Sequence, residues 1–272
     1  MLGLMKSVAL TIAGSDPSGG AGIQADLKTF HQFGVYGEAV ITLVTVQNTT
    51  RVSRVEALPP ALVLDQIQAV LEDIPPAAAK TGALGTAEMV EAVAGAAARF
   101  AFPLVVDPVM VSKHGLPLAP ESALSAFRER LLPCAALATP NVPEAEALTG
   151  VAIRDMGGVR RAALAIREMG ARAVLIKGGH LEGDATDVLF DGDEWREYPA
   201  PRIETRHTHG SGCTYSAAIA AALASGLPLA DAVALAKAFI HEAIRTNPNL
   251  GHGCGPLNHH APLSAPGAPV RC

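Results

Sequence analysis

Short runs rich in Val, Ile and Leu alternate with stretches of helical periodicity along most of this chain. The strand-like runs are SVALTIAGS, AVITLVTVQN, AAAKTGAL, PLVVDPVM, ALATPN and AVLIKGGH. Helical periodicity occupies roughly residues 20–33, 61–71, 87–99, 121–131 and 158–169. Continuous apolar strands that alternate with helices are typical of a parallel sheet covered on both faces. The sequence therefore predicts an α/β fold with a mostly parallel central sheet.

The last third of the chain departs from this alternation. In DVLFDGDEWREY two strand-like runs flank Asp191-Gly192-Asp193, which predicts a late antiparallel hairpin. Helical stretches at 212–225 and 229–246 then close the fold. Residues 261–272 are rich in Pro, Ala and Gly, and we expect this tail to be disordered. Because no repeat or linker interrupts the chain, we expect residues 1–260 to form a single domain.

Charge, hydropathy and cysteine content argue against several classes of protein. The formal net charge is −5 and Lys and Arg do not cluster, which argues against nucleic acid or an anionic membrane as partner. Small anionic ligands remain compatible with this charge, because loops and helix ends bind them locally. No apolar run reaches the ~20 residues that span a bilayer. The four cysteines show neither metal-ligand spacing nor a disulfide framework, so we expect a cytoplasmic location.

Polar or glycine residues follow each of the expected parallel strands. In open parallel sheets, ligands bind beyond the carboxyl ends of the strands. The residues at these ends are Gly14-Ser15-Asp16, Gln47-Asn48, Asp107, Asn141 and Lys177-Gly178-Gly179. Topology alone therefore predicts a binding site along this edge of the sheet.

The segment GSDPSGGAG resembles a phosphate-binding loop, but Gly20 stands where the Walker A motif requires Lys. Residues 20–25 match the G-x-G-x-x-A dinucleotide pattern, yet the next strand ends in Gln47, where an acid that binds ribose belongs. Two interpretations stay open. The glycines pack a helix against the sheet, or the loop closes around a small substrate, which we favour.

The segment HGSGC places a thiol between glycines at the start of a helix. Gly210 and Gly212 allow backbone N–H groups to converge there, and these groups and the helix dipole form an anion-binding site. The same field favours the thiolate of Cys213, although burial opposes it. An isolated cysteine is more often a small buried hydrophobic residue. Its position between two glycines and a helix start favours a catalytic role.

The segment TPNVPEAEAL follows an expected strand and offers two interpretations. Asn141 and Glu144 have the spacing of a capping box at a helix start. They are also suited to hold Mg²⁺ through its water shell, with Asp107 beside them. Lys177 follows AVLI and precedes two glycines, which is a suitable place for a cation that faces phosphates. The histidines at 180, 207 and 209 lack metal-ligand spacing and are expected to cap or pack.

Together these segments resemble the ribokinase-like superfamily, and specifically the hydroxymethylpyrimidine/phosphomethylpyrimidine kinases of thiamine biosynthesis. The resemblance covers nearly the whole chain at the expected spacings. It rests on ALTIAGSDPSGGAGIQADLKTF, VQNT, DPVMVSK, TPNVPEA, IKGGH, THGSGCTYSAA and GHGCGPLNH.

The resemblance implies a three-layer α/β/α sandwich, commonly dimeric, that uses ATP and Mg²⁺. It implies phosphorylation of 4-amino-5-hydroxymethyl-2-methylpyrimidine and then of its monophosphate. It also implies these roles: Gly14, Asp26, Gln47 and Val109 line the pyrimidine pocket, Lys177, Asn141 and Thr208 bind the nucleotide, Asp107 and Glu144 hold the metal, Gly210, Ser211 and Gly212 form the anion hole, and Cys213 is the catalytic base. Ser211 replaces the usual Thr, which we expect to be harmless. Tyr215 is less usual at its position and could alter contacts near the hole.

Two alternatives to this function stay open. Relatives specialised for pyridoxal tend to have Met at the position of Gln47 and Cys at the position of Ser112, so both residues favour the pyrimidine. The second alternative is a pyrimidine-binding regulator without catalysis. The presence of Cys213, Lys177 and Glu144 together argues against it.

Overall fold

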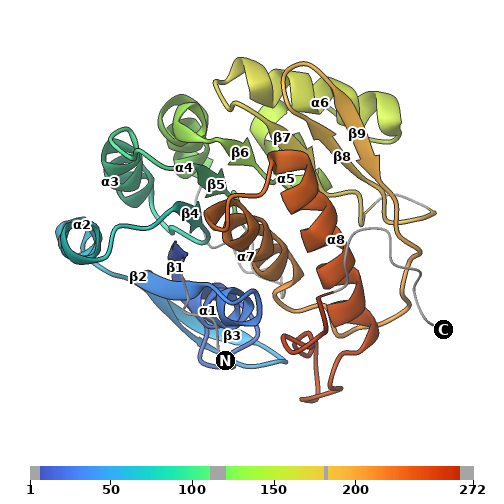
Figure 1. Ribbon diagram of the computed structural model, residues 1–272, viewed down its shortest axis with the longest axis horizontal. Coiled ribbons are helices and arrows are strands. Elements are labelled where there is room, and N and C mark those ends of the chain that lie inside the picture. Colours follow the sequence, from blue (N-terminus) through green and yellow to red (C-terminus); the bar gives the residue numbers. More distant parts are fainter. Residues whose placement is uncertain (1–6, 111–120, 181–182, 264–272) are drawn as a thin grey trace.

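In the part of the chain that the structure describes, nine strands form one mixed sheet at the centre of the protein (Figure 1). The computed structural model describes residues 7–110, 121–180 and 183–263; residues 264–272 of the expected tail and Ser112 lie outside them. The strands are β1 (Val8–Ser15), β2 (Tyr36–Gln47), β3 (Val52–Ala57), β4 (Ala78–Thr81), β5 (Leu104–Val106), β6 (Leu137–Ala138), β7 (Val174–Ile176), β8 (Asp187–Phe190) and β9 (Trp195–Tyr198).

The strand order is β3-β2-β1-β4-β5-β6-β7-β8-β9. The six strands from β2 to β7 in this order pair in parallel, so the predicted parallel sheet is confirmed. β8 and β9 pair antiparallel from Asp187 opposite Tyr198 to Phe190 opposite Trp195, which confirms the predicted hairpin. All the parallel strands therefore bring their carboxyl ends to the same edge of the sheet.

Helices cover both faces of the sheet. α1 (Gly22–Gln32), α7 (Ser211–Ala224) and α8 (Leu229–Arg245) pack on one face, where α7 and α8 lie side by side (Figure 1). The opposite face carries α2 (Pro60–Asp73), α3 (Ala87–Ala97), α4 (Glu121–Ala126), α5 (Val142–Thr149) and α6 (Met156–Glu168). Among the described helices, none is both long enough and apolar enough to cross a membrane.

Alternate residues of the central strands enter the two apolar cores. Leu10 and Ile12 of β1 belong to the core under α2–α6, and Ala9 belongs to the core under α1, α7 and α8. Because both faces are covered, these strands are apolar at nearly every position rather than at every second one. This double burial explains why their runs stand out in the sequence.

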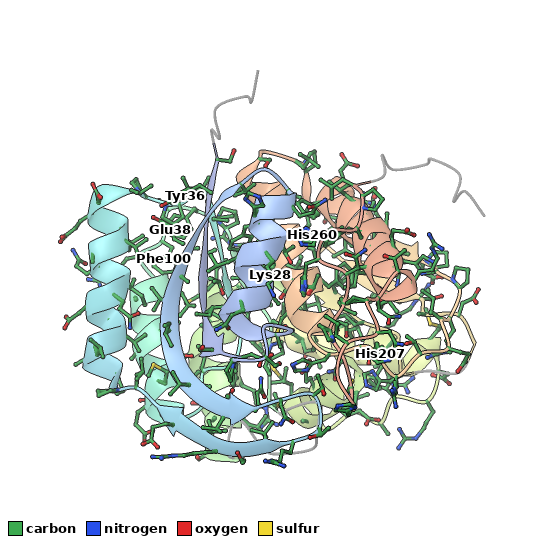
Figure 2. All side chains as sticks on the ribbon, turned by 90° about the horizontal axis from the view of Figure 1, so that it is seen from below. Lys28, Tyr36, Glu38, Phe100, His207 and His260 are labelled. Atoms are coloured by element: carbon green, nitrogen blue, oxygen red, sulfur yellow. The ribbon has the colours of Figure 1, made fainter. Side chains whose placement is uncertain are left out.

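β3 is the strand that the sequence analysis did not predict. It pairs antiparallel with β2 at the edge of the sheet, and its residues are exposed or only partly buried. An edge strand buries little, so its sequence, VSRVEA, lacks the apolar run that marks the inner strands. Figure 2 shows β2 curving along this side of the molecule from Tyr36.

The helix predicted at 121–131 also differs in detail. α4 ends at Ala126 and continues as a π-helical turn, Phe127–Leu131, followed by a 3₁₀ turn, Leu132–Cys134. Phe127 and Leu131 are fully buried in the core under α2–α6. The wider turn changes the spacing of the side chains, and periodicity in the sequence does not distinguish it from a regular helix.

Candidate active site

A cavity of about 510 Å³ opens at the carboxyl edge of the parallel strands. The N-termini of α1, α5 and α7 surround it, as expected for a sheet of this topology. Every predicted site residue except Asp26 lines this cavity: Gly14, Gln47, Asp107, Val109, Asn141, Glu144, Lys177, Thr208, Gly210, Ser211, Gly212 and Cys213. The fold therefore brings together residues that are almost 200 positions apart in the sequence.

Residues 208–213 form the turn that leads into α7, called here the anion-binding turn. Gly210 is the N-cap of α7 and has φ 80°, a left-handed conformation that favours glycine. A Cβ at Gly210 would collide with the carbonyl of Gly20. The first N–H groups of a helix have no partner within the helix, so this turn presents donors and a positive dipole end to the cavity.

Gly212 connects this turn to the opposite wall of the cavity. A Cβ at Gly212 would lie 3.2 Å from Nζ of Lys177 and 3.6 Å from Oδ2 of Asp107. Nζ of Lys177 donates to Oδ1 of Asp107 at 2.8 Å. Burial alone would lower the pKa of Lys177, but Asp107 and Glu144 outweigh it and raise that pKa, so the ammonium stays charged. A fixed cation thus lies next to the anion-binding turn.

Cys213 lines the cavity one residue beyond Gly212. Burial raises the pKa of its thiol to about 11, against the opposing effect of the Lys80 ammonium. Asp26 and Asp107 raise the pKa further, whereas a hydrogen bond from the Gly22 N–H lowers it. The expected preference for thiolate is therefore wrong for the protein without ligands. Desolvation outweighs the Lys80 ammonium and the Gly22 N–H, although the cysteine lines the cavity and is only partly buried.

Asp26 is a second correction, because it lies outside the cavity lining. Its carboxylate is fully buried and accepts hydrogen bonds from Thr11 Oγ1 at 2.6 Å and Lys80 Nζ at 3.0 Å. Lys80 is also fully buried, although it stands in the middle of strand β4. Oδ2 of Asp26 therefore neutralises Lys80, whereas its Oδ1 is buried without a hydrogen-bond partner among the described residues. The lysine inside the apolar run AAAKTGAL was the available signal for a buried partner of opposite charge.

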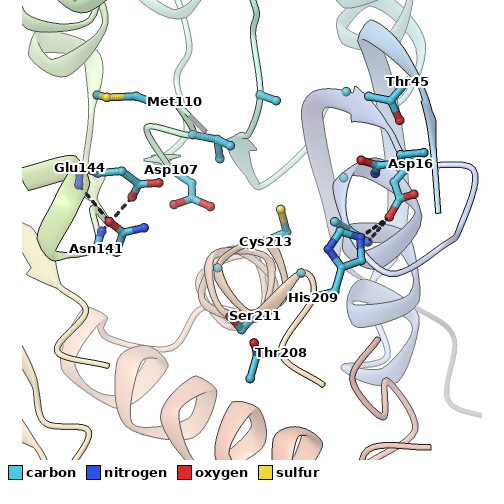
Figure 3. A pocket seen from close by; sticks show the side chains of 18 of the residues that line it. Asp16, Thr45, Asp107, Met110, Asn141, Glu144, Thr208, His209, Ser211 and Cys213 are labelled. Carbon is cyan, nitrogen blue, oxygen red and sulfur yellow. Dashed lines mark hydrogen bonds and ion pairs between the residues drawn. The ribbon is translucent and has the colours of Figure 1, made fainter. Parts of the chain in front are cut away.

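Asn141 and Glu144 form the capping box that their spacing indicated. Oδ1 of Asn141 accepts from the Glu144 N–H at 2.9 Å, and Oε2 of Glu144 accepts from the Asn141 N–H at 2.8 Å (Figure 3). Burial raises the pKa of Glu144 to about 7, and Asp107 adds to this while Lys177 opposes it. The capping interpretation is thus confirmed, and the capping bond of the Glu144 side chain uses Oε2.

Asp16 and His209 are site residues whose roles the sequence analysis missed. Oδ2 of Asp16 lies 2.8 Å from Nε2 of His209, and both side chains line the cavity (Figure 3). Burial raises the pKa of Asp16, but hydrogen bonds from His209, Ser18 and Gln47 outweigh it and hold the pKa well below its usual range. The two residues are 193 positions apart, so nothing local in either segment indicates the pair.

The comparisons with known proteins agree with this arrangement. Residues 16–258 match the family model described as phosphomethylpyrimidine kinase. The chain belongs to this family. A hydroxymethylpyrimidine/phosphomethylpyrimidine kinase from Rhizobium meliloti is 51% identical over 259 residues, which cover 94% of this chain and 97% of that protein. A thiamine biosynthesis bifunctional protein from Geobacter sulfurreducens is 51% identical over 256 residues, 93% of this chain, and the chain spans 52% of that longer protein.

Among solved structures, an ADP complex of Bacillus subtilis pyridoxal kinase is similar to the protein described here. The TM-score is 0.88 and the identity 38%, over 94% of this chain and 98% of that chain. This similarity confirms the ribokinase-like, three-layer fold that the sequence resemblance implied. The relatives are named as kinases, so the reaction class is phosphoryl transfer.

Tyr215, the residue that is less usual for the family, lies outside the cavity lining. It is buried in the core under α1, α7 and α8. Burial and the neighbouring carboxylate of Asp187 raise its pKa well above the ordinary value. Its side chain therefore contributes to packing, and an effect on the anion-binding turn stays a prediction.

Proposed function

We propose that this protein uses ATP to phosphorylate 4-amino-5-hydroxymethyl-2-methylpyrimidine and then its monophosphate, as a kinase of thiamine biosynthesis. The observation that carries the proposal is the placement of Cys213 and the anion-binding turn beside the Lys177–Asp107 pair in one cavity. The names of the relatives at 51% identity support the same two reactions.

The residues of the cavity divide into roles suited to phosphoryl transfer. This reaction needs alignment and charge neutralisation more than covalent chemistry from the protein. The N–H groups of Gly210, Ser211 and Gly212 hold the migrating phosphoryl group, and Lys177 neutralises charge on the leaving diphosphate. The thiolate form of Cys213 accepts the proton of the hydroxymethyl group as the oxygen of that group forms the new bond to phosphorus and the bond to the leaving diphosphate breaks. Asn141 and Thr208 contact the nucleotide.

The carboxylates of Asp107 and Glu144 fit a magnesium ion that is bound with the nucleotide. In the described part of the chain, no three His, Cys, Asp or Glu side chains gather as a metal cage. Mg²⁺ does not require such a cage, because it keeps several waters and usually takes one or two carboxylates plus phosphate oxygens. Asp107 and Glu144 both line the cavity near Lys177. When bound, the ion would reduce the negative charge on the phosphates.

Gly14, Gln47 and Val109 are proposed to bind the pyrimidine ring. A Cβ at Gly14 would press on the side chain of Leu43, so glycine keeps this wall of the cavity open. The amide of Gln47 offers a donor and an acceptor, which matches a ring nitrogen next to an exocyclic amine. Asp26 is left out of this set because it lies outside the cavity lining and its Oδ2 is bound to Lys80.

Phosphorylation of pyridoxal is the second candidate activity, because a solved pyridoxal kinase shares this fold at 38% identity. ATP consumption is measured with the hydroxymethylpyrimidine, with pyridoxal, and without an acceptor. We expect turnover with the pyrimidine alcohol and a much slower rate with pyridoxal. A preference for pyridoxal would replace the proposed substrate, and consumption that does not depend on any acceptor would refute a kinase of either kind.

We also propose that the protein is a cytoplasmic homodimer that pairs through the outer face of β2. Thr45 and Gln47 line the cavity, whereas Val44 and Val46 point to the other face and are 40% and 55% exposed. Burial of such a patch stabilises association. Light scattering tests the proposed dimer. We expect the wild type to be a dimer and Val46→Glu to be a monomer. A monomeric wild type refutes the proposal.

A further inference from the structure

Two loops from opposite ends of the sequence meet at one side of the cavity. The Asp16 loop, residues 16–22, leads into α1, and the anion-binding turn leads into α7. Oδ2 of Asp16 and Nε2 of His209 are 2.8 Å apart, and their side chains are 3% and 7% exposed. Figure 3 shows this pair on one side of Cys213, with Asn141 and Glu144 on the other.

Asp16 organises its own loop as well as the contact with His209. Its Oδ1 accepts from the N–H and the hydroxyl of Ser18 at 2.8 and 2.7 Å. Its Oδ2 accepts from the N–H groups of Gly20 at 3.2 Å and Ala21 at 2.9 Å. One carboxylate thus fixes the backbone of the whole loop. A carboxylate is the only side-chain group that can accept this many bonds without offering a donor.

The two loops are in direct contact around this pair. A Cβ at Gly20 would lie 2.6 Å from Cδ2 of His209, and a Cβ at Gly210 would collide with the Gly20 carbonyl. Gly22, the last residue of the Asp16 loop, has an N–H near enough to the sulfur of Cys213 to lower the pKa of the thiol. A shift of one loop therefore moves both the donors of the anion-binding turn and the environment of the thiol.

We propose that Asp16 and His209 are positioning residues, a latch that holds the anion-binding turn and the Gly22 N–H in register around Cys213. This inference rests on the proposed function, because it assigns a role in phosphoryl transfer to residues outside the reacting groups. A misplacement of about 1 Å in such a site costs on the order of 10² in rate. Loss of the latch should therefore lower kcat more than it raises KM for ATP, whose Lys177 and Asn141 contacts lie on the other wall.

The variants His209→Ala, Asp16→Asn and their double mutant remove the latch, and His209→Gln restores a donor near the position of Nε2. His259→Ala is the matched control. Nε2 of His259 lies 3.1 Å from Oγ1 of Thr214, also on α7, and His259 is 6% exposed. The substitution His259→Ala therefore removes the contact of an equally buried histidine with α7 and leaves Asp16 and His209 in place. Melting temperatures are measured for all of them.

The first readout is steady-state kinetics with ATP and the pyrimidine alcohol. We expect His209→Ala and Asp16→Asn each to lower kcat on the order of 10²-fold, with no further loss in the double mutant and partial rescue in His209→Gln. His259→Ala should keep kcat even if its melting temperature falls equally. A loss in His209→Ala without a loss in Asp16→Asn would overturn the latch and assign His209 a direct role. Equal losses in the His259→Ala control would make the effect one of general stability.

The second readout needs no substrate, so it separates the latch from the proposed function. Alkylation of Cys213 by iodoacetamide is followed by peptide mass spectrometry, which distinguishes it from the other cysteines. We expect faster alkylation in His209→Ala and in Asp16→Asn, because the anion-binding turn around the sulfur is then less firmly held. His259→Ala should be alkylated at the wild-type rate. Unchanged alkylation in the latch variants would refute the proposal. If the wild-type enzyme does not phosphorylate the pyrimidine, the proposed function is refuted and the latch is not.

Discussion

The variant Gly212→Ala distinguishes the effect of the anion-binding turn on turnover from its effect on the stability of the protein. Gly212 lies in the first turn of α7 without the left-handed backbone that Gly210 has. The added methyl would stand 3.2 Å from Nζ of Lys177 and 3.6 Å from Oδ2 of Asp107, a tight contact that needs a shift of a few tenths of an ångström. Alanine in place of glycine favours a helix by up to about 1 kcal/mol. The crowding offsets part of this gain.

The melting temperature of Gly212→Ala should therefore stay within about 2–4 °C of wild type. Turnover should fall by ~10²–10³, the value of one donor in such a hole, or about 2.7–4 kcal/mol of transition-state stabilisation. The methyl displaces the N–H groups and the Lys177 ammonium at the place where charge develops. Both quantities are measured on the same purified protein, with the first phosphorylation followed by ADP release.

Two other glycines supply the controls for this experiment. Gly95 lies in α3, and a Cβ there meets no atom within 4 Å, so Gly95→Ala gives the helix-propensity gain alone and should keep full activity. Gly210→Ala forces a side chain into the left-handed region and against Gly20, so it should lose both stability and activity. If Gly212→Ala keeps wild-type turnover while its melting temperature is unchanged, the turn does not hold the phosphoryl group.

Four further predictions follow from the structure, two on the thiol and one each on the pyrimidine contact and the buried ion pair. Cys213→Ala should lower turnover of the alcohol by ~10²–10⁴ and affect the second phosphorylation less, since a phosphate needs no deprotonation; equal losses contradict a role as base. Because burial raises the pKa of Cys213 to about 11, thiolate is gained as pH rises, so kcat/KM should increase from about pH 7 to about pH 9, and a flat profile contradicts this. Gln47→Met should lower kcat/KM for the pyrimidine by up to ~10⁴ and raise the relative rate on pyridoxal; an unchanged ratio shows that Gln47 does not contact the ring. Asp26→Asn should cost ~3–5 kcal/mol of unfolding free energy because Lys80 is left buried and unpaired, and a wild-type urea midpoint refutes this.

Local patterns in the sequence determined the parallel sheet, the late hairpin and most of the helices. The inner strands are detectable because both of their faces are buried, so their residues are apolar without interruption. β3 escaped detection because it lies at the sheet edge and buries little. The capping box at Asn141 was also predictable, since both of its partners lie within three residues of each other.

The glycine turn with Cys213 and the polar strand ends likewise marked the cavity before the structure was known. A parallel sheet requires all those strand ends to lie at one edge, and this rule is independent of the details of packing. The sequence therefore determined which strand ends lie together at the cavity. The sequence did not determine the charge state of each group at the cavity.

Only the tertiary structure decided how the charged groups pair. Asp26 turns to Lys80, Asp16 to His209, and the thiol of Cys213 is held protonated. Each outcome depends on the loss of water and on partners that come from other strands and loops. Desolvation and long-range pairing arise from the packed arrangement of the whole chain, so no segment of the sequence carries them by itself.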